Sequence, residues 1–450
     1  MTPATKNSSP TPHQNVFNPL HHTTTVSYSI DEVHYLIAHY ADITCHLATR
    51  SFAPRDALTD ATYLREHLGE YGRAAMELGR ARHTAARKQL PADWIVCHES
   101  AQQATPLPVA RVRAARLART LGPGARIHDI TCSIGTEGHA LVAAGIQYFG
   151  SDLDPSRVIM ARHNLGATFP TANAANKPQT VWGFHVADAR HPATIPGAAD
   201  AIIADPARRH QGRRITNPDE LLPPLATIIA TYPRTPMAIK CAPGIDFTGW
   251  DGLVSLVSVD GGVKEACLYS PALADGGVKE ACLYSPALAD GLHREAVIIR
   301  DDTMDILTDR GDPGADTPVG EPGTYIIDPD GAVIRAGLVR HYAHRENLWF
   351  LDERIAYLTG DRIPAGMSGF PYIETVPLKK LRSVLRDHDC GSVEILVRGV
   401  DVDPDRLRQK LRLAGSRPMA VVCTRIGRSG VALVCEARVV GEPPAGQPIP

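Results

Sequence analysis

Hydrophobic and polar residues follow three successive patterns along this chain. In the first hundred residues, apolar side chains recur at helical spacing, as at Val33, Leu36 and Ile37. Short apolar runs of strand length come next, separated by helical patterns, as in a doubly wound parallel sheet. The last part combines further strands with an amphipathic helix. The patterns predict an α/β protein with a helical N-terminal region at 28–121, an α/β domain at 122–310, a small α+β domain at 324–440, and disordered tails at 1–27 and 441–450.

Two acidic residues lie at the ends of the first two predicted strands. The segment 127–138 joins a short apolar strand, which ends near Asp129, to a turn of small residues and then to a helix. A second strand, 147–151, leads into Asp152. Small residues in such a turn let the backbone approach a ligand, and an acid after the second strand can accept hydrogen bonds from a ribose. The pattern predicts a nucleotide-type site.

Two more acids follow the next strands. Asp188 comes after a predicted third strand at 181–186, and Asp205 ends the fourth, which begins near Ala199. Parallel strands present their carboxyl ends at the same edge of a sheet, where ligands bind. We therefore expect the acids that end all four strands to lie along one rim.

With these motifs the chain resembles the class I S-adenosylmethionine-dependent methyltransferases. The resemblance implies a Rossmann-like, seven-stranded methyltransferase sheet and S-adenosyl-L-methionine as the cofactor. It implies that Asp152 binds the ribose and that Asp188 lies beside the adenine amine. The residues it assigns to the cofactor are Asp129, Thr131, Ser133, Gly135, Asp152, Asp188 and Ala189, and those it assigns to catalysis are Asp205 and Pro206.

The turn departs from the glycine-rich pattern of that family. Thr131 and Ser133 stand where glycines are expected. A β-branched residue resists positive φ, so either Thr131 keeps a negative φ or the turn has another shape. Ser133 can instead offer its hydroxyl to the methionine end of the cofactor.

A basic segment follows the fourth-strand motif. Enzymes that methylate base amino groups carry a second proline and an aromatic residue there, but this chain has Ala207 and Arg208. An arginine plane can also stack on a base. The candidate substrate-binding residues are Arg208, Arg209, Arg213 and Arg214, because guanidinium groups bind phosphate in a bidentate manner. A solvated basic loop is the alternative.

The C-terminal part has a narrower resemblance. Segments 325–339 and 395–404 are similar to actinobacterial methyltransferases with a C-terminal THUMP-like domain, which implies a module related to RNA-binding ones. Residues 378–428 hold 12 Lys and Arg against 6 Asp and Glu, in a chain whose net charge is −2. This local positive charge favours RNA as a partner, and a merely solubilising face is the alternative.

Composition argues against several other classes. The nine cysteines form no Cys-x-x-Cys pair, and no histidine lies at zinc-site spacing from an acidic or cysteine ligand set, so we expect no metal. No apolar run approaches the length of a membrane span, and residues 1–27 lack the apolar core of a signal peptide. We expect a cytoplasmic protein with reduced thiols.

One segment is duplicated. Residues 260–275 read DGGVKEACLYSPALAD, and 275–290 repeat them without a difference. Two units are too few for a repeat fold. The composition suits an edge hairpin strand of the methyltransferase sheet, with the second copy looped out.

The first functional hypothesis is an S-adenosylmethionine-dependent methyltransferase that acts on RNA (tRNA or rRNA), with the C-terminal module assisting substrate binding. The second is a non-catalytic RNA-binding scaffold that retains the fold. A nicotinamide-dependent oxidoreductase is disfavoured because Gly-x-Gly-x-x-Gly is absent. Cys241, after a predicted fifth strand, could attack a pyrimidine ring, but a buried small residue is the favoured interpretation. The role of Lys240 stays open.

Overall fold

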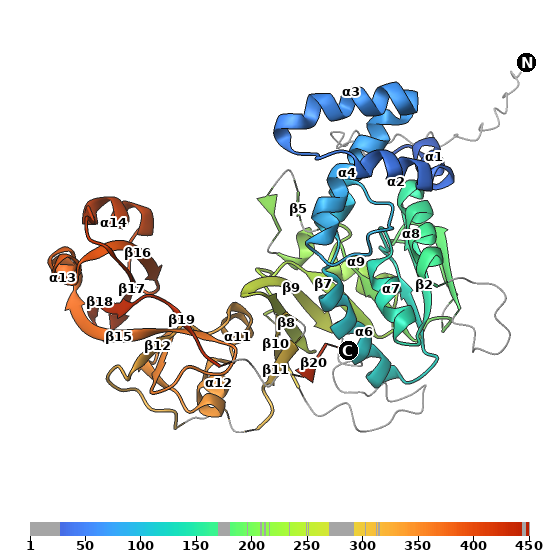
Figure 1. The fold of residues 1–450 in the computed structure, drawn as a ribbon. Helices are drawn as coiled ribbons and strands as arrows, with labels where there is room; N and C mark the ends of the chain where they lie inside the picture. Colours follow the sequence, from blue (N-terminus) through green and yellow to red (C-terminus); the bar gives the residue numbers. More distant parts are fainter. Residues whose placement is uncertain are drawn as a thin grey trace, which may run out of the picture.

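The computed structural model describes residues 28–169, 181–269, 292–442 and 447–449, except positions 196, 208, 211–212, 216, 234, 249, 251, 302, 312 and 314–315. Figure 1 shows helices at the N-terminal end, a central sheet with helices on both faces, and a C-terminal lobe that extends to one side. The expected tail at 1–27 and the second copy of the duplicate lie outside the described residues.

The N-terminal region is helical, as predicted. Ser29 and Glu32 form reciprocal side-chain bonds that begin the first helix. The apolar positions of this region are buried in one core, which also takes up Ile134 and Met160 of the sheet domain. The helices are α1 (Ile30–Ala38), α2 (Tyr40–Ala48), α3 (Ala57–Leu68), α4 (Gly72–Ala86) and α5 (His98–Gln103).

The central sheet has ten strands in the order β20-β11-β10-β8-β9-β7-β4-β1-β2-β3. Strands β1 to β4 and β7 run parallel, and β9 lies antiparallel between β7 and β8. The strands are β1 (Arg126–Asp129), β2 (Gln147–Asp152), β3 (Trp182–Val186), β4 (Ala201–Ala204), β7 (Met237–Cys241), β8 (Val254–Val259), β9 (Gly262–Tyr269), β10 (Arg294–Arg300), β11 (Thr303–Thr308) and β20 (Gln447–Pro448).

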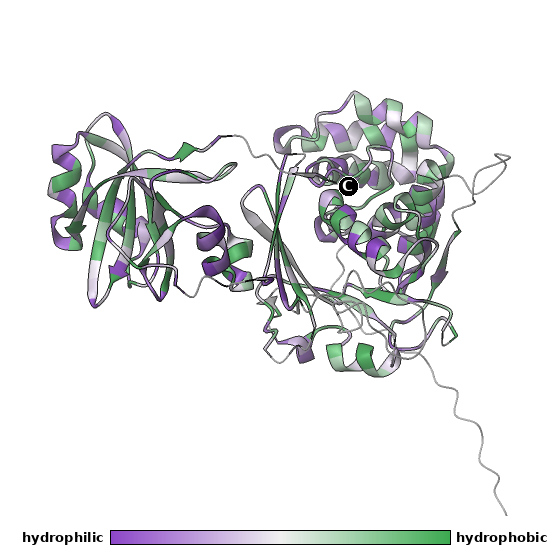
Figure 2. Ribbon diagram, turned by 90° about the horizontal axis from the view of Figure 1, so that it is seen from below, coloured by the Kyte–Doolittle hydropathy of each residue, from purple (hydrophilic) through white to green (hydrophobic). Residues whose placement is uncertain are grey.

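Helices cover both faces of this sheet. On β4, Ile203 points to one face, which is covered by α6 (Leu107–Leu121), α7 (Thr136–Ala143) and α8 (Pro155–Thr168). Its neighbour Ile202 points to the other face, where α9 (Leu225–Thr231), α11 (Gly331–Ala336) and α12 (Val339–Glu346) pack. Parallel strands buried on both faces carry near-continuous apolar runs, as in β4, which reads AIIA. Figure 2 gives the hydropathy of each residue along the ribbon.

Three expectations about the sheet are corrected. Ten strands replace the predicted seven, because β10, β11 and β20 continue the sheet beyond β8. The first copy of the duplicate forms β9, which is a hairpin partner of β8 as expected but lies inside the sheet and not at its edge. Gln447–Pro448, expected in a disordered tail, pairs with β11.

The C-terminal lobe has its own sheet of eight strands, in the order β13-β14-β12-β15-β18-β17-β16 with β19 beside β15. The further strands and the amphipathic helix that the sequence predicts in this part are present. The elements are β12 (Tyr325–Ile327), β13 (Trp349–Asp352), β14 (Ile355–Gly360), β15 (Ser368–Pro377), α13 (Leu381–Asp387), β16 (Cys390–Val397), α14 (Pro404–Leu411), β17 (Arg417–Ile426), β18 (Ser429–Glu436) and β19 (Val439–Val440).

The lobe is not a separate unit from residue 324 onward. Its helices α11 and α12 contribute Val333 and Tyr342 to the same core as Val254 and Ile298 of the central sheet. The segment between β12 and β13 therefore belongs, by packing, to the central domain.

Candidate active site at the carboxyl ends of the strands

A pocket opens at the carboxyl ends of β1, β2, β4 and β7. The connection between α5 and α6 supplies part of its wall, so the N-terminal region takes part in the site. Its lining residues are Gln103, Ala104, Thr105, Asp129, Thr131, Cys132, Ser133, Ile134, Thr136, Glu137, Asp152, Arg157, Asp205, Ala207, Leu222 and Lys240.

The turn after β1 wraps around the carboxylate of Asp152. The Ser133 N–H donates to Oδ2 of Asp152 at 3.0 Å, and the Asp154 N–H donates to Oδ1 at 3.0 Å. Ser133 adopts a φ of +47°, whereas Thr131 is not among the residues with positive φ. The turn therefore keeps its tight shape by placing the left-handed residue at 133, where the side chain is small and not branched at Cβ.

Gly135, the N-cap residue of α7, has a φ of +89°. A Cβ atom there would lie 2.8 Å from Cδ1 of Leu165 on α8. Gly135 is therefore needed for the close packing of the turn against α8, behind the pocket and not in its lining.

Asp129 is buried beneath the turn. Its carboxylate accepts hydrogen bonds from the Thr131 N–H and the Tyr148 hydroxyl, each at 3.1 Å. Burial and the nearby Glu137 raise the pKa of Asp129 to about 7. Thr131 in turn accepts a hydrogen bond from the Asp205 N–H at 2.6 Å, which ties the ends of β1 and β4 together.

A line of ionic side chains ends at the pocket. Nη1 of Arg113 lies 2.8 Å from Oε1 of Glu137, which lies 3.2 Å from Nζ of Lys240. The same Nζ lies 2.8 Å from Oδ2 of Asp205. Burial alone raises the pKa of Glu137, but Arg113 and Lys240 outweigh it and hold that pKa below its usual value.

The polar atoms of the pocket fit the cofactor that the sequence implies. The hydroxyl oxygens of Ser133 and Thr136 are buried and have no hydrogen-bond partner among the described residues. Both residues line the pocket, Ser133 in the turn after β1 and Thr136 at the start of α7, so a ligand in the pocket is the candidate partner of their hydroxyls. Leu153 and Val186, beside the ends of β2 and β3, expose 68% and 55% of their surface, which is apolar area suited to cover a base.

The pocket brings together five of the nine residues assigned from the sequence: Asp129, Thr131, Ser133, Asp152 and Asp205. Pro206 is buried next to the pocket lining. Asp188 and Ala189 lie after β3 outside the lining, and the Asp188 carboxylate is bound by Arg190 at 2.7 Å. This hydrogen bond is the main reason that the pKa of Asp188 is lowered.

The basic segment after β4 forms a two-stranded hairpin of β5 (Arg209–His210) and β6 (Arg213–Arg214). The position of Arg208 and the side chains of the other three arginines lie outside what the structure describes. In Figure 1, β5 projects from the central sheet on the side where the C-terminal lobe stands.

Lys240 and Cys241 are neighbours on β7, and their side chains point to opposite faces of the sheet. Lys240 points into the pocket, whereas Cys241 is fully buried in the core on the opposite face of the sheet. Cys241 is therefore a buried small residue, as favoured from the sequence. Lys240, Glu137 and Arg113 were not assigned to the site in advance; the signal for Lys240 was a lysine in an otherwise apolar strand.

In the part of the chain that the structure describes, no cluster of three or more His, Cys, Asp or Glu residues has the geometry of a metal site. The same residues include no helix that is long and apolar enough to span a membrane.

Comparison with known proteins agrees with this geometry. The chain is 43% identical over 385 residues to a protein of Mycobacterium tuberculosis H37Rv, named as an uncharacterized S-adenosylmethionine-dependent methyltransferase, and the match covers 84% of this chain and 94% of that protein. The counterpart in strain CDC 1551 gives the same values. A crystal structure from Porphyromonas gingivalis W83, provisionally assigned as a methyltransferase, has a TM-score of 0.59 at 17% identity, covering 86% of this chain and 99% of that one.

The ten-stranded sheet with its turn and strand-end acids is thus an α/β fold that binds a nucleotide-type cofactor. This chain belongs to the S-adenosylmethionine-dependent methyltransferases, and S-adenosyl-L-methionine is its cofactor. A family described as THUMP domain-like matches residues 368–437. This match begins after α11 and α12, in agreement with the packing of those helices on the central sheet.

Proposed function

We propose that this methyltransferase acts on RNA, with the C-terminal THUMP-like domain binding the substrate. A groove in that domain carries the proposal. Its walls are α13, the start of β16 and the loop after α14. The cationic residues of the groove are Lys379, Arg382, Arg386 and Arg412, all of them exposed.

The positive charge of the groove is largely uncompensated. Within the described residues, Lys379, Arg382 and Arg412 form no salt bridge, and Arg386 approaches only Asp387, at 3.9 Å. Asp389, the acidic residue of the lining, accepts a hydrogen bond from the Ser416 hydroxyl at 2.5 Å. Clustered cations without protein partners bind a phosphate backbone and release its counterions.

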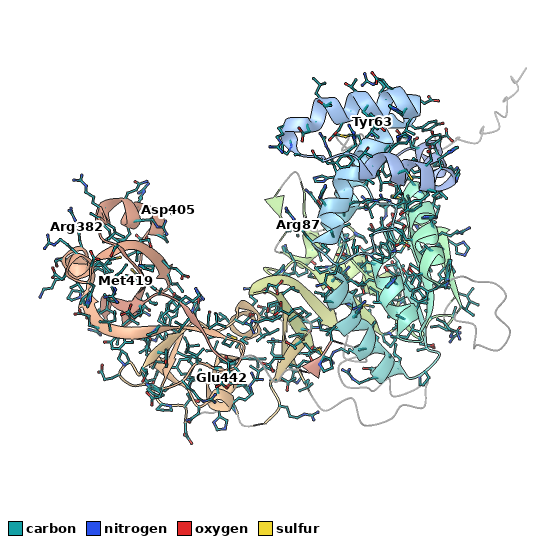
Figure 3. All side chains as sticks on the ribbon, viewed as in Figure 1. Tyr63, Arg87, Arg382, Asp405, Met419 and Glu442 are labelled. Carbon is teal, nitrogen blue, oxygen red and sulfur yellow. The ribbon has the colours of Figure 1, made fainter. Side chains whose placement is uncertain are left out.

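The position of the groove favours a large substrate. Figure 3 places Arg382 at the end of the lobe that lies away from the central sheet. A small molecule in the cofactor pocket could not also reach this groove. A folded RNA could contact the groove, the hairpin of β5 and β6, and the pocket at the same time.

The chemistry at the pocket needs few groups. S-adenosyl-L-methionine, when bound, supplies a methyl group that moves to the lone pair of the acceptor while the carbon–sulfur electron pair stays on sulfur. Asp152 and Ser133 hold the cofactor in this proposal, and Asp205 with Pro206 orients the acceptor. The Asp205 carboxylate accepts a hydrogen bond from the acceptor N–H or O–H and takes its proton as the new bond forms.

The proposal also places the protein in the cytoplasm. Seven cysteines whose side chains the structure describes are all free, as a reducing compartment allows.

Binding of unmodified tRNA and rRNA transcripts at several salt concentrations tests the RNA proposal. Replacing the four groove cations with glutamine should weaken binding and lower the salt slope by about 0.7 for each lost single-strand contact. Arg354→Gln is the matched control, because Arg354 is an exposed arginine of the same lobe that does not line the groove. RNA binding that is equally strong in the groove variant, or equally weakened by Arg354→Gln, would count against this surface.

A further inference from the structure

We infer that Lys240 is a positioning residue for methyl transfer, and that Arg113 and Glu137 hold it in place against Asp205. The inference rests on the proposed role of Asp205 at the acceptor. It extends that role, because it makes a helix outside the strand-end motifs part of the active site. Arg113 lies on α6, Glu137 on α7 and Lys240 on β7.

Burial shows that the line of charges has one accessible end. The side chains of Arg113, Glu137 and Lys240 are 3%, 5% and 5% exposed, whereas that of Asp205 is 22% exposed. Asp205 is therefore the most exposed of the four groups at the pocket, and in this inference the other three act through it. Ion pairs at the protein surface contribute little to stability. A buried lysine between two carboxylates is held firmly, because no water molecules can replace the carboxylates as its hydrogen-bond partners.

The geometry explains why the cation is a lysine. Its single ammonium group donates to Oε1 of Glu137 and to Oδ2 of Asp205 at 3.2 and 2.8 Å. Oδ2 is thereby fixed in direction, and the peptide N–H of Asp205 is fixed separately by Thr131 at 2.6 Å. The carboxylate is thus oriented before any substrate arrives, which is the condition for efficient transfer between two aligned groups.

The charges also balance along the line. Two cations alternate with two carboxylates, so the removal of Lys240 would leave Glu137 and Asp205 without the cation that lies between them. The two carboxylates would then repel, and Asp205 would turn away from the acceptor. Arg113 cannot compensate, because its guanidinium group lies on the far side of Glu137.

A double-mutant cycle tests the inference, with methyl transfer to a pool of unmodified tRNA and rRNA transcripts as the assay. Lys240→Gln should lower kcat by about tenfold to a hundredfold, in the range that misplacement of a catalytic group produces. S-adenosylmethionine affinity should stay close to that of the parent. Lys240→Gln should lower kcat no further in an Asp205→Asn background, because both changes remove the same interaction.

The outcomes separate the two claims. If Asp205→Asn leaves kcat unchanged, the proposed function of Asp205 is wrong. If Asp205→Asn lowers kcat but Lys240→Gln does not, or lowers it independently, the positioning role is wrong. Loss of cofactor affinity without loss of kcat in Lys240→Gln would instead make Lys240 a cofactor ligand and overturn the inference.

Two controls guard against a purely structural effect. Arg116→Met removes another ion pair of α6, that with Glu295, which lies away from the pocket. It should lower thermal stability and leave kcat intact, whereas Arg113→Met should lower both. Lys240→Arg should recover part of the lost kcat.

A readout that needs no RNA completes the test. The chain has nine lysines, so the ammonium resonance of Lys240 can be assigned by NMR from its loss in Lys240→Arg. A buried, paired ammonium exchanges slowly with water. The Lys240 signal should therefore be sharp in the parent and broaden in Asp205→Asn and in Glu137→Gln. A Lys240 signal that resembles those of exposed lysines, or that is unchanged by both substitutions, would show that Lys240 is not paired with Glu137 and Asp205.

Discussion

Replacing Asp152 with alanine should weaken S-adenosylmethionine binding by about tenfold to a hundredfold. The carboxylate lies at the end of β2 and lines the pocket. A charge-assisted hydrogen bond to a ribose hydroxyl contributes about 1.5–3 kcal/mol, and about 1.4 kcal/mol corresponds to a tenfold change in Kd. Burial raises the pKa of Asp152, so cofactor affinity should also fall when acid protonates this carboxylate.

The same substitution also affects the turn. Asp152 accepts the N–H groups of Ser133 and Asp154, each at 3.0 Å, and alanine leaves both without this acceptor. Water reaches the partly exposed site and replaces some of the loss, so unfolding free energy should fall by about 1–3 kcal/mol. Asp152→Asn keeps an oxygen for one N–H group and should fall between parent and alanine in stability.

Isothermal titration with S-adenosylmethionine and thermal unfolding measure the two effects separately. Asp200→Ala is the matched control, because the Asp200 carboxylate is paired with Arg126 and lies outside the pocket. This control should change Kd far less than Asp152→Ala. Unchanged affinity in Asp152→Ala would show that the ribose assignment is wrong.

Three further predictions concern the fold around the site. Gly135→Ala should lower the melting temperature, because a left-handed φ of +89° costs an L residue about 1–2 kcal/mol and the new Cβ meets Leu165 at 2.8 Å; an unchanged melting temperature would refute this. Because burial raises the pKa of Asp129 from 3.8 to about 7, the folded protein keeps a proton that the unfolded chain has lost, and stability falls as pH rises between these values. The melting temperature of Asp129→Asn should therefore exceed that of the parent by more at pH 8 than at pH 5. An equal difference at both pH values would show that the buried Asp129 carboxyl does not cause the pH dependence. Clean deletion of 276–290 should leave solubility and cofactor affinity intact, because the first copy supplies β9 and a longer loop costs little entropy; insoluble protein would show that both copies are structural.

The acids of the site could be predicted because parallel strands end at one edge. Asp129, Asp152 and Asp205 each follow a short apolar run, and that regularity alone brings them to one pocket. Asp188 shares the sequence pattern, yet Arg190, two residues along, binds its carboxylate. A local pairing of this kind is invisible to strand periodicity, and the place of Asp188 beside the adenine stays a prediction.

The rest of the site depends on packing between distant segments. Nothing in the local pattern of Arg113 or Glu137 shows that α6 and α7 lie against each other so that these side chains meet. Likewise, Val333 reads as part of the C-terminal domain, but it packs on the central sheet because β10 extends that sheet beyond the predicted seven strands. Long-range contacts decided both cases.

The most direct test of the central claim is the transfer of a labelled methyl group from S-adenosylmethionine. The purified protein is incubated with the pool of unmodified tRNA and rRNA transcripts, and the RNA is digested to nucleosides. We expect label in a methylated nucleoside, and its loss in Asp205→Ala while that variant still binds the cofactor. Label that enters no RNA, or that enters RNA equally with Asp205→Ala, would contradict the account.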